Sequence, residues 1–235
     1  MKKDKRKFSL AILRVIKWGA IGVAGLLVLA LIVVGAARLM TAQSHAVDPA
    51  CGIDESIYVP LNGQEQYLLI RGNDVDNPVI IWLHGAGEGG TDPRVALVGN
   101  KVVNLATDTV QQYFDGGAYV LAAQCPTMWM DDGSGQYTSD GTSKYTAALM
   151  ELIKAYVNSN SDIDASRVYI GGCSNGGFMT MNMIVHYPKY FAAAYPVCEA
   201  YTNDALTDEM VESIKDMPIW FTHAKNDPTV KIGTI

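Results

Sequence analysis

A serine stands between two glycines at a spacing that suits nucleophilic chemistry. Residues 172–176 read Gly-Cys-Ser-Asn-Gly and follow the apolar run 168–171, and the residues after them can begin a helix. Between a strand and a helix, this G-x-S-x-G pattern exposes the serine hydroxyl on a sharp, strained turn, for which Gly172 and Gly176 leave room. A glycine-rich turn with an incidental serine is the alternative. Ser174 is the candidate nucleophile for attack on a carbonyl carbon.

Two backbone N-H groups are candidates for binding the negative oxygen that such an attack creates. One belongs to Asn175, the residue after the candidate nucleophile. The other belongs to Ala86, in the glycine-rich loop that follows the apolar run 79–83. Donors of this kind come from the residue after the nucleophile and from the loop after an earlier strand. The alternative interpretation of the loop is a flexible turn.

These segments resemble the α/β-hydrolase superfamily. The resemblance is carried by His-Gly-Ala-Gly-Glu at 84–88, Cys-Pro at 125–126 and Tyr-Ile-Gly-Gly-Cys-Ser-Asn-Gly-Gly at 169–177. Within the superfamily, the chain is similar to prolyl-oligopeptidase-like peptidases and to the polyhydroxybutyrate-depolymerase or feruloyl-esterase-like group. The resemblance covers residues 55–235. It implies a serine hydrolase that cleaves ester or peptide bonds of small substrates without a cofactor, using a triad in the chain order Ser, Asp, His.

The resemblance also implies the acid of the triad. Residues 220–230 are similar to the strand and turn that hold the aspartate in this superfamily, which makes Asp227 the orienting acid. A carboxylate at the end of an apolar strand is well placed to orient an imidazole. An ordinary Asn-Asp-Pro turn is the alternative, and Glu199 is a second candidate acid.

The implied general base is not found among the 235 residues. The superfamily places this histidine some tens of residues after the acid, and the sequence ends eight residues after Asp227. His45 belongs to a linker, His84 to the oxyanion loop, His186 to the helix after the nucleophile and His223 to the last strand. We therefore expect the base to lie beyond this sequence, and the chain alone to be nearly inactive. An inactive, membrane-tethered binding domain on a hydrolase scaffold is the alternative.

The elements that would position these residues are indicated by apolar runs. Runs without alternation are typical of parallel strands covered on both faces. Residues 143–157 carry apolar side chains at spacings of three and four, which predicts a helix. Two short runs, 56–61 and 65–71, are separated by Asn62-Gly63, a signal for an antiparallel hairpin. Strands that alternate with helices predict an α/β sandwich, and the resemblance implies that it is an α/β-hydrolase sandwich, incomplete at its C-terminal end. The predicted strands are 79–83, 118–123, 168–171, 192–197 and 219–222.

The N-terminal region is much more apolar than the rest. Residues 18–37 contain no charge, and twenty residues at about 1.5 Å each cross a hydrocarbon core of about 30 Å. Basic residues before this run predict a cytoplasmic N-terminus. We expect a cytoplasmic segment (1–17), a transmembrane anchor (18–38), a linker (39–54) and an extracytoplasmic hydrolase domain (55–235) on a single-pass protein of the cell membrane. Secretion after cleavage of a signal peptide is the alternative.

The net charge and the cysteine spacing argue against some classes of binding partner. The first 38 residues hold eight of the 18 basic and one of the 24 acidic residues, which leaves 10 basic against 23 acidic, a net charge near −13. This balance argues against nucleic acid as a partner. In an exported domain, the four cysteines are candidates for one or two disulfides in three possible full pairings. Their spacing does not match a zinc site, so no metal is expected. They are Cys51, Cys125, Cys173 and Cys198.

Overall fold

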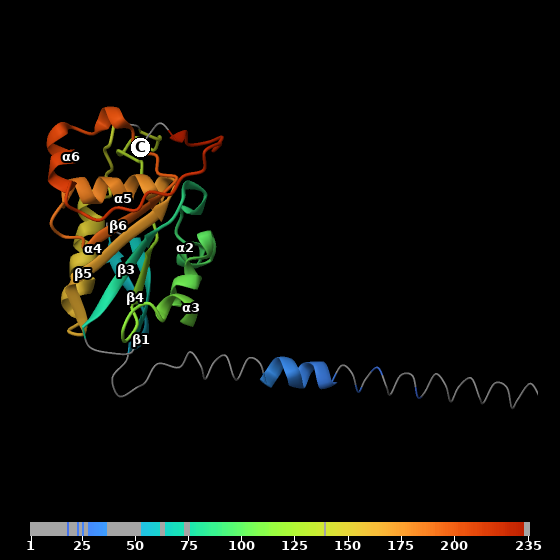
Figure 1. The fold of residues 1–235 in the computed structure, drawn as a ribbon. Coiled ribbons are helices and arrows are strands. Elements are labelled where there is room, and N and C mark those ends of the chain that lie inside the picture. Colours follow the sequence, from blue (N-terminus) through green and yellow to red (C-terminus); the bar gives the residue numbers. More distant parts are fainter. Residues whose placement is uncertain are drawn as a thin grey trace, which may run out of the picture. The chain divides into compact units, whose positions relative to one another are not determined.

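A computed structural model describes most of the chain (Figure 1). The described residues are 18, 23, 25, 28–36, 53–61, 64–72, 76–138 and 140–232. The chain divides into two compact units, residues 1–46 and 47–235, which are described separately.

The first unit contains a helical stretch at residues 28–36. In the described part of this unit, no helix has the length and apolar character needed to cross a membrane. Residues 19–22, 24, 26–27 and 37–38 of the expected anchor lie outside the described residues, as do the expected cytoplasmic segment and the linker up to residue 52. The anchor therefore stays a prediction.

The second unit opens with the predicted antiparallel hairpin. Strands β1 (Ile53–Leu61) and β2 (Gln64–Gly72) pair along their whole length, from Ile53 opposite Gly72 to Leu61 opposite Gln64. The connection is two residues long, which is the loop length that an Asn-Gly pair favours. Residues 62 and 63 themselves lie outside the described part.

A parallel sheet forms the centre of this unit. Its strands lie in the order β4-β3-β5-β6, and every neighbouring pair is parallel. Four predicted strands are confirmed, although β5 begins earlier than expected. The fifth predicted strand, 219–222, does not form a regular strand. This segment pairs with β6 only through two parallel bridges, from Ile219 to Ala194 and from Thr222 to Val197. The strands are β3 (Asn77–Leu83), β4 (Tyr119–Ala123), β5 (Ile163–Cys173) and β6 (Ala193–Val197).

Helices lie on the sheet, and Figure 1 shows α4 and α5 beside β5 and β6, with α2 and α3 on the β4 side. Helix α4 confirms the predicted amphipathic helix and begins three residues later than expected. The short helices were not predicted. Two of them have cap residues at their N-terminal ends, because Asp92 caps α2 and Thr207 caps α6. The helices are η1 (Ala86–Glu88), α2 (Pro93–Val98), η2 (Gly99–Ala106), α3 (Asp108–Gln111), α4 (Thr146–Ser159), α5 (Asn175–His186), η3 (Asn203–Ala205) and α6 (Asp208–Ile214).

Alternation along β3 separates the two faces of the sheet. Val79, Ile81 and Leu83 point to one face and are fully buried. Trp82 points to the other face, where its ring lies 5.7 Å from that of Tyr195 in β6. Because all four strands run in the same direction, their carboxyl ends meet at one edge, where ligand sites of such sheets form. The loops after β3, β4, β5 and β6 therefore converge there.

Candidate active site

Ser174 occupies the sharp turn that its sequence pattern predicts. It is the single residue between β5 and α5, with φ 57° and ψ −112°. A positive φ is strained for a residue that has a Cβ, and such strain persists only where the surroundings fix it. Here the Ser174 N-H donates to the Val197 carbonyl at 2.9 Å, and its own carbonyl accepts from the Phe178 N-H at 2.9 Å. The serine is held, half-buried, at the carboxyl edge of the sheet.

The glycines beside it have no room for a side chain. A Cβ on Gly176 would lie 1.9 Å from the Leu83 carbonyl oxygen, and one on Gly172 would lie 2.5 Å from the Gly176 carbonyl oxygen. Both obstacles are backbone atoms, which cannot rotate away. The close approach of this turn to the end of β3 is therefore possible only with glycine, while its role as a nucleophile elbow stays a prediction.

Asn175 begins helix α5. The first N-H groups of a helix have no acceptor within it and carry the positive end of the helix dipole, so they suit a developing negative charge. The side chain is buried, and its Oδ1 accepts a 2.6 Å hydrogen bond from the Trp129 N-H. Its Nδ2 is buried with no hydrogen-bond partner among the described residues. The position fits the predicted backbone donor.

The loop after β3 lies against the elbow. A Cβ on Gly85 would lie 3.6 Å from the Cys173 carbonyl oxygen, in ordinary contact. The Gly85 N-H donates to Glu88 Oε2 at 2.7 Å, and Glu88 Oε1 accepts from Asn100 Nδ2 at 2.6 Å. These bonds fix the turn in which Ala86 begins η1. The structure thus brings the loop with Ala86 beside the turn with Ser174, while the oxyanion role of Ala86 stays a prediction.

His84 is a structural residue. Its Nε2 accepts the Cys125 N-H at 2.8 Å, so the proton sits on Nδ1, which donates to the Gly85 carbonyl at 2.7 Å. Burial lowers the pKa of this imidazole and keeps it neutral. With both nitrogens engaged, His84 joins the ends of β3 and β4 and has no free lone pair for a serine proton.

Asp227 lies in a tight turn that follows the two β-bridges of Ile219 and Thr222. Its Oδ1 accepts from the N-H groups of Thr229 at 2.8 Å and Val230 at 3.0 Å, and these bonds, with nearby His223, hold the pKa of the carboxyl below its ordinary value. Burial is the main cause that raises the pKa of the Cys173 thiol to about 12, and the neighbouring Cys198, Glu88 and Asp227 add to the shift. The lowered pKa keeps Asp227 ionised at neutral pH, while its role as the orienting acid stays a prediction.

The described histidines do not complete a triad. His223 Nε2 lies 2.7 Å from the Val230 carbonyl and 3.8 Å from Asp227 Oδ2, beyond hydrogen-bond range of the carboxylate. His186 ends α5, about 16 Å along the helix axis from the elbow, and bonds the Asn182 carbonyl through Nδ1. Among the residues that the structure describes, none of these histidines bonds the Ser174 hydroxyl.

Glu199 is also close to the elbow. It directly follows the turn after β6 and is buried, and a Cβ on Gly177 of α5 would lie 2.7 Å from its Cα. Burial raises the pKa of this carboxyl to about 7, although a hydrogen bond from the Tyr201 N-H opposes the shift. Its role as an alternative acid stays a prediction.

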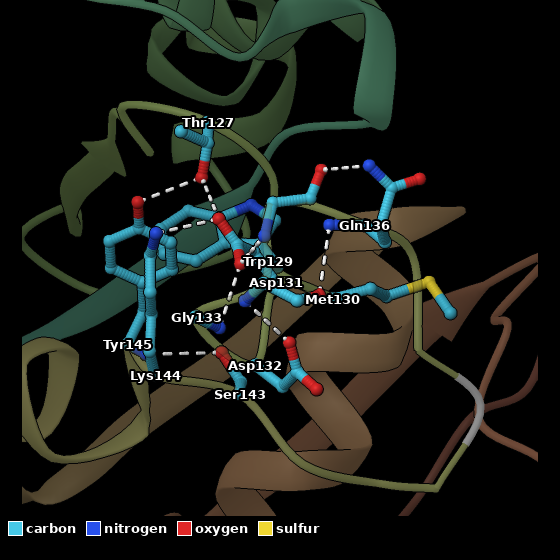
Figure 2. Close-up of polar contacts among 12 residues, drawn as sticks. Thr127, Trp129, Met130, Asp131, Asp132, Gly133, Gln136, Ser143, Lys144 and Tyr145 are labelled. Carbon is cyan, nitrogen blue, oxygen red and sulfur yellow. Dashed lines mark hydrogen bonds and ion pairs between the residues drawn. The ribbon is translucent and has the colours of Figure 1, made fainter.

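Sequence reasoning missed a buried carboxylate in the loop between β4 and α4. Asp131 is fully buried and accepts from Lys144 Nζ at 2.6 Å, Thr127 Oγ1 at 2.8 Å and the N-H groups of Gly133 at 2.8 Å and Gly135 at 3.0 Å (Figure 2). Burial alone would raise the pKa of Asp131, but these bonds outweigh it and hold the pKa well below its ordinary value. The Asp-Gly-Ser-Gly stretch at 132–135 was the available signal for a turn.

The same loop supports the elbow through Trp129. This side chain is buried, its ring centre lies 5.2 Å from that of His84, and its Nε1 donates to the His84 carbonyl at 3.1 Å. Its backbone N-H donates to Asn175, as described above. Trp129 therefore joins the loop after β3 to the first residue of α5.

A known protein family matches the part of the chain that holds the candidate site. The sequence model of the Phospholipase/Carboxylesterase family matches residues 65–234, a stretch that includes the loop after β3, the elbow and Asp227. This match covers well over half of the chain. The chain belongs to the Phospholipase/Carboxylesterase family. The predicted α/β-hydrolase superfamily and fold are thereby confirmed, while the narrower resemblance to prolyl-oligopeptidase-like peptidases or to polyhydroxybutyrate depolymerases stays a prediction.

Three relatives illustrate the family. Acyl-protein thioesterase 1 of Cryptococcus neoformans var. neoformans serotype D is 24% identical over 180 residues, which cover 70% of this chain and 72% of that protein. A probable carboxylesterase (SOBER1-like) of Arabidopsis thaliana is 25% identical over 164 residues, 64% of this chain and 60% of that protein. The crystal structure of a thermostable esterase is similar with a TM-score of 0.65 at 31% identity, over 79% of this chain and 49% of that one. The chain thus spans about half the length of that esterase.

Within the described residues, no three His, Cys, Asp or Glu side chains converge to hold a metal ion. In this carboxylesterase-family chain, backbone N-H groups lie next to Ser174 at the start of α5, and the buried Glu199 lies against Gly177 of the same helix. These groups suit acyl transfer to a serine hydroxyl and the binding of an oxyanion.

Proposed function

We propose that this member of the carboxylesterase family is a serine esterase in which Ser174 attacks the carbonyl carbon of a small acyl ester. The observation that carries the proposal is the strained backbone of Ser174, with φ 57°, between two glycines that no other residue can replace without a clash. A glycine-rich turn with an incidental serine would not need this strain. Backbone strain held by its surroundings is characteristic of functional sites.

The proposed reaction has two steps. A histidine base takes the Ser174 proton, the hydroxyl oxygen attacks the carbonyl, and the tetrahedral oxyanion is bound by the N-H groups of Asn175 and Ala86. The base returns its proton to the leaving alcohol, and an acyl-enzyme remains. Water then attacks the acyl-enzyme by the same route and regenerates Ser174. Asp227 orients the histidine, and Glu199 is the alternative acid.

We propose that the base is a histidine other than His84, His186 and His223. His84 uses both ring nitrogens in the scaffold, and His186 is at the far end of α5. The Nε2 of His223 is bonded to the Val230 carbonyl, and its Nδ1 is buried without a partner among the described residues. None of these groups has the Ser-His hydrogen bond that general-base catalysis needs.

An ester or thioester is the substrate class we favour over a peptide. The family model is that of phospholipases and carboxylesterases, and the relatives named above are a thioesterase, a probable carboxylesterase and an esterase. Peptide bonds undergo the same chemistry at a serine but have a poorer leaving group. A peptidase activity is therefore an outcome of the test and not part of the proposal.

We also propose that residues 18–38 anchor the protein in the cell membrane, with the hydrolase domain on the extracytoplasmic side. The support is the uncharged run 18–37 and the basic residues before it. Extraction of cell membranes with alkaline carbonate should leave the protein in the pellet, and protease added outside intact cells should digest the domain. Recovery of the intact domain in the soluble fraction would contradict the anchor.

The activity is tested with the protein expressed from its own locus, so that every residue of the natural product is present. The assay compares p-nitrophenyl acetate with a p-nitroanilide peptide. Ser174→Ala should lower kcat for the ester at least about 1,000-fold, because no other group replaces the nucleophile. Ser213→Ala removes a hydroxyl from the exposed face of α6 and should leave kcat unchanged. An unchanged rate in Ser174→Ala would favour the non-catalytic binding domain.

A further inference from the structure

Two cysteine thiols meet beside the nucleophile. Cys173 is the last residue of β5, Cys198 follows the last residue of β6, and their Sγ atoms lie 3.5 Å apart. Both side chains are half-buried, whereas Cys125 is fully buried after β4. Among the cysteines that the structure describes, only Cys173 and Cys198 are in contact. Cys51 lies outside the described residues.

The backbone fixes this approach. The Cys198 N-H donates to the Thr222 carbonyl at 2.7 Å, and its φ of 38° lies in the left-handed region that residues with a Cβ seldom adopt. On the other side, the Ser174 N-H donates to the Val197 carbonyl at 2.9 Å. Cys173 directly precedes Ser174, and Cys198 directly follows Val197, so each cysteine is next to one end of this hydrogen bond. The two Cβ atoms are oriented by the sheet and not by mobile loops.

We propose that Cys173 and Cys198 are a site of oxidative modification, at which a small-molecule or protein disulfide converts the two thiols into a disulfide bond. The bond would join the carboxyl ends of β5 and β6 immediately before Ser174. Closure requires the sulfurs to move from 3.5 Å to about 2.05 Å, a change that side-chain rotation can supply. The inference is independent of the proposed esterase activity, because it concerns only the geometry of the two thiols.

The chemistry is a two-step exchange. The Cys198 thiolate attacks one sulfur of the external disulfide, which forms a mixed disulfide and releases one thiol. The Cys173 thiolate then attacks the Cys198 sulfur, which forms the Cys173-Cys198 bond and releases the second thiol. The cysteines lose two electrons and two protons, and the external disulfide gains both. The same exchange with the two cysteines in the opposite order gives the same disulfide bond.

The disulfide should stabilise the fold. It closes a loop of about 25 residues that contains Ser174 and the whole of α5. A crosslink of this length restricts the unfolded chain, and for a domain of this size it should raise Tm by roughly 5 to 10 °C. The crosslink restrains the strand ends on which the strained turn of Ser174 depends.

The test is to incubate the purified protein with oxidised glutathione or with reduced dithiothreitol, block free thiols in denaturant and digest with trypsin. Cleavage after Arg167, Lys189 and Lys215 separates the two cysteines into peptides 168–189 and 190–215. The oxidised sample should contain these two peptides linked through sulfur, and the reduced sample should contain both alkylated. Two alkylated peptides after oxidation, or a link from either peptide to Cys51 or Cys125, would overturn the proposal.

Thermal unfolding provides a second measurement. Oxidation should raise Tm in the wild-type protein and in the control Cys51→Ser, which keeps the pair. It should leave Tm unchanged in Cys198→Ser, which cannot form the bond. If Cys198→Ser does not fold, the peptide map of the wild-type protein still shows whether Cys173 and Cys198 form the disulfide. An equal rise in all three proteins would show that the pair is not the oxidised site.

Discussion

The backbone N-H of Trp129 donates a 2.6 Å hydrogen bond to Oδ1 of Asn175, the residue that follows the candidate nucleophile. The bond crosses from the loop after β4 to the first residue of α5, and both groups are buried. The turn at Ser174 is therefore stabilised by a loop that lies far from it in the sequence.

Replacement of Asn175 by alanine should destabilise the protein by about 1 to 3 kcal/mol, because the buried Trp129 N-H loses its acceptor. The free energy of unfolding in urea measures the effect. Asn158→Ala, on the exposed side of α4, is the matched control and should change the free energy by less than about 0.5 kcal/mol. Equal stability of the two variants would mean that the bond to Trp129 does not hold the turn.

Replacement of Gly176 by alanine should cost about 3 kcal/mol or more, since the added Cβ would meet the Leu83 carbonyl oxygen at 1.9 Å and the backbone has to shift. Gly87→Ala serves as the control, because nothing lies within 4 Å of a Cβ at that position. Chemical denaturation of the two variants in parallel gives the comparison. A Gly176→Ala protein as stable as Gly87→Ala would be incompatible with the close approach of the elbow to β3.

Asp131→Asn should lower the free energy of unfolding at neutral pH by about 2 to 4 kcal/mol, because it removes a buried charge that Lys144 and two backbone N-H groups stabilise. The folded pKa of Asp131 is lowered, so its contribution is present above the unfolded pKa of about 3.9 and is lost as the pH falls below it. The difference from wild type should therefore shrink below about pH 4. Exposed Asp132→Asn is the control, and a constant difference at all pH values would contradict the charge effect.

Glu199→Gln tests a pH dependence of stability opposite in direction to that of Asp131. The folded pKa of Glu199 is raised to about 7 from an unfolded value near 4.5, so its favourable contribution is complete below pH 4.5 and is lost as the pH rises toward 7. Relative to the glutamine variant, the wild type should lose roughly 3 kcal/mol over this range. Unfolding midpoints measured from pH 4 to 8 would test this, with exposed Glu151→Gln as the control. Parallel curves for Glu199→Gln and wild type would disprove the shift.

Local patterns were enough to predict the sheet and the elbow. The apolar runs that became β3 and β4 are almost entirely buried, and those that became β5 and β6 are buried or half-buried, which agrees with their largely apolar composition. The turn at Ser174 was predictable because its sterics depend on Gly172 and Gly176, which are neighbours in sequence. The Asn-Gly connection likewise matched the register of β1 and β2.

Contacts between distant segments could not be predicted. The Asp131 network depends on how a loop folds back on Lys144, and the bond from Trp129 to Asn175 crosses 46 positions of the chain. The proximity of Cys173 and Cys198 follows from the pairing of β5 with β6, which no local pattern specifies. The edge at 219–222 formed only two bridges, because an apolar run does not determine how regularly it pairs.

The most direct test of the central claim is covalent labelling of the nucleophile. The protein expressed from its own locus is treated with a fluorophosphonate, which reacts with activated serines, and is then digested with trypsin. Ser174 is the only serine in peptide 168–189, so an adduct there identifies it. A phosphonylated peptide 168–189 is expected in the wild-type protein and should be absent in Ser174→Ala. An unlabelled wild-type peptide, or an adduct on another serine, would contradict the assignment of Ser174 as the nucleophile.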